Sequence, residues 1–171
     1  MRIIVLTLAF LTILGVSCEK KKTSREGGIQ IYLLSDYESY QPSMRINEGT
    51  ILREKEPLIR YTDILSYDSR NYSFNITNSA QDILKDKELN LHSRAFVLVA
   101  NHENIYTGYF WASYSSSICP WLTIDPIHAQ YAGELTVQLG YPGLMEGMSI
   151  PDRRNDGRIL SILRHDRKLI E

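Results

Sequence analysis

The sequence has few of the residues and spacings from which catalytic and metal sites are usually recognised. Only two of its 171 residues are cysteines, which excludes a disulfide framework and a zinc site built on cysteine pairs. No Gly-x-Ser-x-Gly motif and no glycine-rich phosphate loop occurs, so neither a hydrolase elbow nor a nucleotide site is indicated. The histidines never occur at His-x-x-x-His spacing. We therefore assign no catalytic residue from these motifs, and we expect no bound metal and no cofactor.

The chain also lacks an excess of charge of either sign. Nineteen lysines and arginines against twenty aspartates and glutamates give a formal net charge of −1. No stripe of basic residues alternates with aromatic ones, although a nucleic-acid interface needs such a concentration of positive charge. We therefore expect no nucleic-acid partner.

The N-terminal segment carries the most specific signal in the chain. Arg2 is followed by the apolar run Ile3 to Val16, which is too short for a stable membrane-spanning helix but typical of a signal peptide. The run ends in Leu14-Gly15-Val16-Ser17-Cys18, which resembles a bacterial lipobox. This resemblance implies that residues 1–17 are a signal peptide and that Cys18 is lipidated. A plain secretory peptide and an N-terminal membrane anchor are the alternatives.

Lipidation at Cys18 implies where in the cell the protein is located. Several acyl chains on one cysteine hold a domain at a membrane essentially permanently, so we expect a lipoprotein of the bacterial cell envelope, on its periplasmic or surface face. Residues 18–28 are polar and end in two glycines, as expected of a flexible tether. Residues 29–171 are long enough for one globular domain. Within it, Cys119 has apolar neighbours, which favours a buried, inert thiol over a nucleophile.

The domain alternates short β-type segments with two helical ones. Strands are predicted over 29–34, 50–52, 72–77, 95–100, 105–112, 121–124 and 134–139, and helices over 79–88 and 158–165. The segment 95–100 (AFVLVA) is apolar on both faces, which predicts a central strand. It forms a hairpin with 105–112 across a four-residue turn. We predict an α+β domain: a mixed or mostly antiparallel sheet of about five to six strands, with two short helices packed on one face.

Aromatic residues gather in the hairpin and just after it. They are Tyr106, Tyr109, Trp111, Tyr114 and Trp121. Alternation places Tyr106 and Tyr114 on one face of the strand and Tyr109 and Trp111 on the other, and only one of these faces has to be core. The other is a possible binding surface for a protein, peptide or glycan. The alternative is that both faces are packed, as is usual for aromatic residues in strands.

Two segments with charged or titratable side chains are candidates for a ligand or metal site. Asp152 to Arg158 carries three arginines that are able to hold an anion, but its signs alternate, which favours a solvated capping loop before the last helix. Asp125 and His128 lie close in sequence, yet Pro126 between them disfavours a shared helical face. No metal site is indicated there.

The order of elements from Tyr72 to Lys168 has a counterpart in a known family. A strand is followed by a turn and helix (Ile76-Thr77-Asn78-Ser79-Ala80), an apolar strand, a turn, a second strand, two further segments and a terminal helix. This order resembles the periplasmic head domain of the SecD protein-export subunit. The resemblance implies an α+β architecture and transfers no catalytic residue. The chain is also similar to uncharacterised lipoproteins of bacterial cell envelopes.

Three functions are consistent with these features. The first is a lipid-anchored binding or interaction module of unknown ligand, because the anchor is present and catalytic motifs are absent. The second is a small envelope hydrolase in which a serine within Ser115–Ser117 is activated by a remote histidine such as His128. The third is a structural subunit of an envelope or export complex.

Overall fold

The computed structural model describes residues 27–86 and 91–171. Cys18, the expected signal peptide, residues 18–26 of the expected tether and the last two residues of the helix expected at 79–88 lie outside them. The strands are β1 (Ile29–Asp36), β2 (Ser39–Tyr40), β3 (Arg45–Ile46), β4 (Leu52–Arg53), β5 (Ile64–Asp68), β6 (Ser73–Ile76), β7 (Ala95–Ala100), β8 (Glu103–Phe110), β9 (Cys119–Ile124), β10 (Glu134–Tyr141) and β11 (Leu169–Ile170). The helices are α1 (Asn78–Asp86), α3 (Pro126–Ala132), α4 (Gly157–His165) and a 3-10 turn, Tyr61–Asp63.

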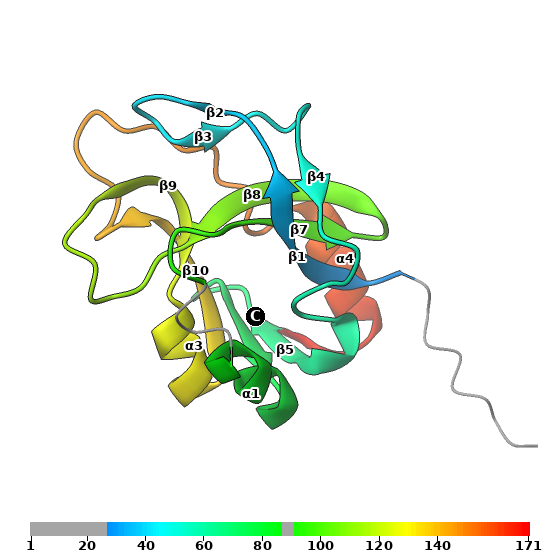
Figure 1. Cartoon of the computed structure of the whole chain (residues 1–171). Coiled ribbons are helices and arrows are strands. Elements are labelled where there is room, and N and C mark those ends of the chain that lie inside the picture. Colours follow the sequence, from blue (N-terminus) through cyan, green and yellow to red (C-terminus); the bar gives the residue numbers. More distant parts are fainter. Residues whose placement is uncertain (1–26, 87–90) are drawn as a thin grey trace, which may run out of the picture.

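The fold is α+β and is built on one large mixed sheet (Figure 1). Nine strands follow one another in the order β11-β5-β6-β10-β9-β8-β7-β1-β4, and β2 pairs with β3 in a separate two-stranded sheet. The pairs β8–β9 and β11–β5 are parallel, whereas the other neighbouring pairs are antiparallel. The expected number of five to six strands is therefore wrong. Strands of two residues, such as β4 and β11, carry no alternating pattern that a sequence reading detects.

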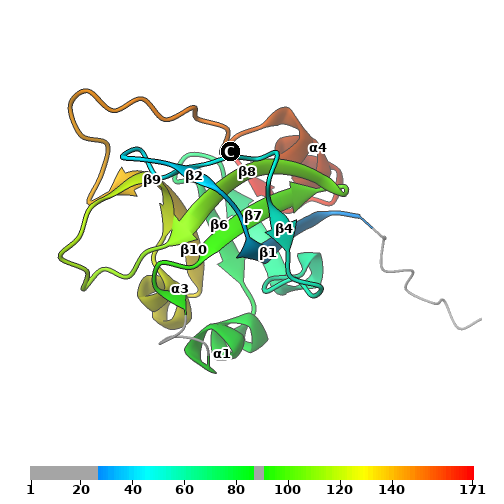
Figure 2. The same cartoon turned by 45° about the horizontal axis from the view of Figure 1, so that its top comes forward.

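Three α-helices lie within the described residues, one more than expected. The additional helix is α3, which lies between the strands predicted at 121–124 and 134–139, where no helix was predicted. Asp125 caps it by accepting a hydrogen bond from the Ile127 amide at 2.9 Å, Pro126 occupies the first turn, and Gly133 ends it at φ +73°. Helices α1 and α3 lie side by side, while α4 lies on another part of the domain (Figures 1 and 2). The helices therefore do not all share one face.

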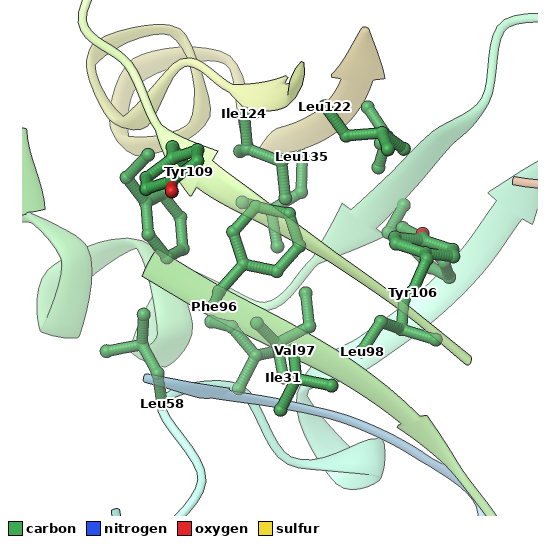
Figure 3. Close-up of a cluster of buried hydrophobic side chains, with 14 of the residues drawn as sticks. Ile31, Leu58, Phe96, Val97, Leu98, Tyr106, Tyr109, Leu122, Ile124 and Leu135 are labelled. Carbon is green, nitrogen blue, oxygen red and sulfur yellow. The ribbon is translucent and has the colours of Figure 1, made fainter. Parts of the chain in front are cut away.

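Strand β7 and its hairpin partner β8 run through the core. All six residues of β7 are buried, as predicted for a central strand. Figure 3 shows side chains from β1, β7, β8, β9 and β10 meeting around them. The Phe96 ring lies so close over Gly108 that a Cβ on this glycine would be 2.6 Å from the Cζ atom of the ring. Fully burying each large side chain of this kind stabilises the fold by about 1.5–3 kcal/mol.

The β7–β8 hairpin is tighter than predicted. Its turn consists of Asn101 and His102 alone, both at positive φ, the geometry of a two-residue type I′ hairpin. Asn101 also accepts a hydrogen bond from the Gly28 amide at 3.0 Å. Because the turn is two residues shorter than expected, β8 begins at Glu103, two residues before the predicted start. The strand ends at Phe110, so Trp111 is not part of it.

Candidate binding groove

The aromatic residues of the predicted surface are mostly inside the protein. Tyr106, Tyr109, Trp111 and Trp121 are at most 6% exposed, whereas Tyr114 is 66% exposed. An exposed aromatic face on the hairpin is therefore absent, and that expectation is wrong. For Tyr109 the physical reason is the β2–β3 hairpin, which packs against β8 and was not predicted from the sequence. Trp111 is covered instead by the His92 ring, with the two ring centroids 5.0 Å apart.

Tyr109 fastens the β2–β3 hairpin to the main sheet. Its hydroxyl donates a hydrogen bond to the Met44 carbonyl at 3.0 Å, and its ring meets the edge of the Tyr37 ring at 6.1 Å. Burial raises the pKa of Tyr109, so the phenol stays protonated and donates this bond at neutral pH. Ile46 of β3 is 1% exposed and packs into the hydrophobic core, which also holds the hairpin in place. The hairpin therefore has a fixed position beside β8 and forms a wall at the surface of the domain.

A groove lies between this wall and the segment 147–153 that precedes α4. It consists of two adjoining hollows of about 390 and 580 Å³, which share Arg45, Trp121 and Pro151. We call it the hairpin groove. Its further lining residues are Tyr40, Pro42, Ser43, Ile46, Asn47, Glu48, Gly49, Tyr106, Pro120, Leu122, Gly147, Met148, Ser149 and Arg153. Figures 1 and 2 both show the β2–β3 hairpin beside the 142–151 segment, which is drawn in orange.

Most polar groups of the groove are bonded within the protein. The indole Nε1 of Trp121 donates to Thr107 Oγ1 at 3.3 Å, which fixes the ring. Arg153 pairs with Glu48 at 3.3 Å and ties the two walls together. Within the described residues the guanidinium of Arg45 has neither a hydrogen bond nor an ion pair. Two arginines against one glutamate leave the lining with one net positive charge.

Tyr106 is the exception among the buried polar groups of the groove. Its side chain is 2% exposed, and its hydroxyl has no hydrogen-bond partner in the described structure. Burial raises the pKa of Tyr106 well above its usual range, so the hydroxyl keeps its proton. An unsatisfied buried hydroxyl costs about 1–3 kcal/mol. The hydroxyl itself is enclosed by the protein, with Tyr67, Arg154 and Asp152 as its electrostatic neighbours, so it lowers stability without facing the groove.

The charged segment before α4 is a capping loop, as favoured from the sequence. Asp156 is the N-cap of α4 and accepts a hydrogen bond from the Arg158 amide at 3.0 Å. Arg158 also pairs with Glu103 at 2.7 Å. Arg154 is 9% exposed and binds Asp152 through two nitrogens. These arginines are engaged within the protein and do not form an anion clasp.

The serine and histidine candidates are not brought together in the part of the chain that the structure describes. Ser115 Oγ accepts from the Ser117 amide at 3.2 Å, whereas His128 faces Glu134 at 3.9 Å. Asp125 is engaged as the cap of α3. The nucleophile, base and orienting carboxylate needed for a serine hydrolase are therefore not assembled here.

Residues 27–86 and 91–171 contain no group of three or more histidine, cysteine or acidic side chains that is arranged to hold a metal ion. They also contain no helix both long and apolar enough to cross a membrane. Cys119 is a buried free thiol whose pKa burial raises to about 11, which agrees with the inert thiol predicted.

Comparison of the chain with protein-family models, with curated proteins and with solved structures finds no match. The site is therefore defined by its geometry. Sequence reasoning selected Tyr106 and Trp121, but for an exposed surface and not for the lining of a groove. It missed Arg45 and the proline-containing walls, because the two-residue strands that build one wall have no periodic pattern.

Proposed function

We propose that this protein is a lipid-anchored binding protein of the bacterial cell envelope that takes its ligand in the hairpin groove. The observation that carries this proposal is the groove itself, whose two adjoining hollows of about 390 and 580 Å³ share Trp121 and Arg45. Arg45 is exposed, and its guanidinium has no hydrogen bond or ion pair within the described residues, so it is free to contact a ligand.

The position of the groove supports access while the protein is tethered. Figures 1 and 2 place the start of the described chain, just before β1, on the other side of the domain from the 142–151 segment. A lipid on Cys18 would hold the domain from the side where β1 begins. The groove would then face away from the attachment point and remain open to ligands in the surrounding compartment.

Lipidation is tested by metabolic labelling of cells with an alkyne-bearing fatty acid. We expect full-length protein to carry the label in the membrane fraction, because the lipobox cysteine accepts the lipid. The Cys18→Ala variant is the matched control and should be unlabelled. Equal labelling of both proteins, or none in either, contradicts the anchor.

Ligand binding in the groove is tested by photo-crosslinking in cells. A benzoylphenylalanine is placed at Ser149, an exposed groove residue, or at Leu65, which is 56% exposed on β5 and lines no part of the groove. We expect a discrete crosslinked product from position 149 that position 65 does not give. Products common to both positions, or none from position 149, contradict a groove-bound ligand.

A further inference from the structure

We propose that residues 142–149, which we call the strap, widen and narrow the larger hollow of the hairpin groove by moving, while the smaller hollow keeps its width. This inference rests on the proposed function, because it describes how the larger hollow opens to a ligand. It draws on the few bonds that hold the strap, on the fixed chain at its two ends, and on the apolar residues that face one another across the larger hollow.

The strap runs over the surface with little to hold it. Figures 1 and 2 show it as a loop, without helix or strand, that extends away from the sheet. Within the described residues its one hydrogen bond runs from the Met148 amide to the Met145 carbonyl at 3.0 Å, and therefore stays inside the strap. A Cβ on Gly143 or Gly147 would have no packed atom within 4 Å. A backbone with so few fixed neighbours moves more readily than a sheet does.

The chain is fixed at both ends of the strap. Before it, Tyr141 is the last residue of β10, and its hydroxyl donates a hydrogen bond to the Ser113 carbonyl at 2.7 Å. After it, Ile150 is 9% exposed and belongs to the hydrophobic core. Arg154 follows and donates to the Val137 carbonyl at 3.0 Å. Movement is therefore confined to the strap and leaves the sheet undisturbed.

The two hollows differ in whether the strap lines them. No residue of the strap is among those that line the smaller hollow, and the ion pair between Glu48 and Arg153 joins its walls. The larger hollow, in contrast, is lined by Gly147, Met148 and Ser149 of the strap. A movement of the strap therefore changes the width of the larger hollow alone.

Apolar side chains on both sides of the larger hollow favour its narrow form. Met148 is half-buried and lines one side, and Pro42, Pro120 and Trp121 line the rest of the wall. Removing apolar surface from water is favourable, so contact of Met148 with these residues holds the strap inward. When the strap moves outward, the same side chains become accessible to a ligand.

The strap is tested by double electron–electron resonance on the full-length protein in detergent micelles, without ligand. Ketoxime spin labels on p-acetylphenylalanine are used, because they leave the cysteines unlabelled. One label is placed at Leu65 on β5, and the second at Glu146 in the strap or, as the control, at Gln41 in the β2–β3 hairpin. All three residues are exposed and line neither hollow.

We expect the distance distribution between positions 65 and 146 to be about twice as wide as that between 65 and 41. Met148→Asp should move the strap outward and change the weights within the 65–146 distribution severalfold, because the apolar contact is lost. Leu144→Asp is the matched control, since Leu144 is 54% exposed and lines neither hollow. It should leave the distribution unchanged.

Distributions of equal width, or the same response to both variants, overturn the strap. Crosslinking from position 149 tests ligand binding separately, so the strap and the binding function fail independently of each other.

Discussion

Two buried tyrosine sites in this protein differ in whether the fold satisfies the hydroxyl. At the first, Tyr67 shares its hydroxyl proton between the Arg154 carbonyl and Asn155 Oδ1, at 3.0 and 2.9 Å. The Arg154 guanidinium binds Asp152 and the Val137 carbonyl and stacks over Tyr72 at 3.5 Å. At the second, the hydroxyl of Tyr106 is equally buried and has no hydrogen-bond partner within the described residues.

The first is a structural site, whereas the hydroxyl of the second forms no hydrogen bond within the described residues. Tyr67 and Tyr106 are both buried, and burial raises the pKa of both phenols, so each is a proton donor at neutral pH. The fold supplies acceptors for one and none for the other. Since satisfied buried networks stabilise a protein and unsatisfied donors destabilise it, the first site contributes to folding and the second is kept at a cost.

The largest expected effect is on the arginine of the structural site. Arg154→Leu should lower the free energy of unfolding by about 2–3 kcal/mol, because the buried Val137 carbonyl loses its donor and Asp152, whose side chain is 40% exposed, loses its ion pair. Arg45→Gln, at the exposed groove residue, should change it by no more than about 0.5 kcal/mol. Urea denaturation followed by circular dichroism measures both. Similar losses in the two variants would remove the distinction between the two arginines.

The two tyrosines should respond in opposite directions to loss of the hydroxyl. Tyr67→Phe should destabilise the protein by about 1–2 kcal/mol, because two acceptors lose their donor. Tyr106→Phe should stabilise it by about 1 kcal/mol, because an unsatisfied buried hydroxyl is removed. The same denaturation experiment applies to both. A loss of stability in Tyr106→Phe would show that its hydroxyl has a partner within the protein.

The smallest effect is a pH dependence confined to the structural site. Arg154 lowers the pKa of the Asp152 carboxyl below its usual value of 3.8, so folding gains stability from this group above about pH 4 and loses it as the pH falls through the lower folded pKa. Asp152→Asn should therefore cost up to about 1 kcal/mol at pH 7. The gap from the unsubstituted protein should narrow below pH 4. Denaturation at several pH values measures it, and a constant gap would argue against an ionic contribution.

The main sheet was predictable where its strands are long and patterned. Segments 29–34 and 134–139 are strands and 158–165 is a helix, because each repeats apolar residues at the period of its structure. Segment 95–100 is a short continuous apolar run, which is typical of a strand buried on both faces. Helix α3 was missed although Asp125, Pro126 and Gly133 stand at its start and end. The seven residues of α3, Pro126–Ala132, show little helical periodicity. Capping residues without such a pattern are also typical of a loop.

The groove was less predictable than the sheet. Its outer wall depends on β2 and β3, each of two residues, and on contacts between Tyr109 and Met44 that are 65 positions apart in the chain. Aromatic composition identified Tyr106 and Trp121, but no local pattern indicates that a hydroxyl will be buried without a partner. That property arises only when distant segments pack together.

The most direct test of the account repeats the crosslinking from position 149 in proteins that also carry Arg45→Gln or Arg167→Gln. Both arginines are exposed, but only Arg45 lines the groove. We predict that Arg45→Gln weakens the discrete crosslinked product several-fold and that Arg167→Gln leaves it unchanged. The account is contradicted if the product is equally strong in both variants.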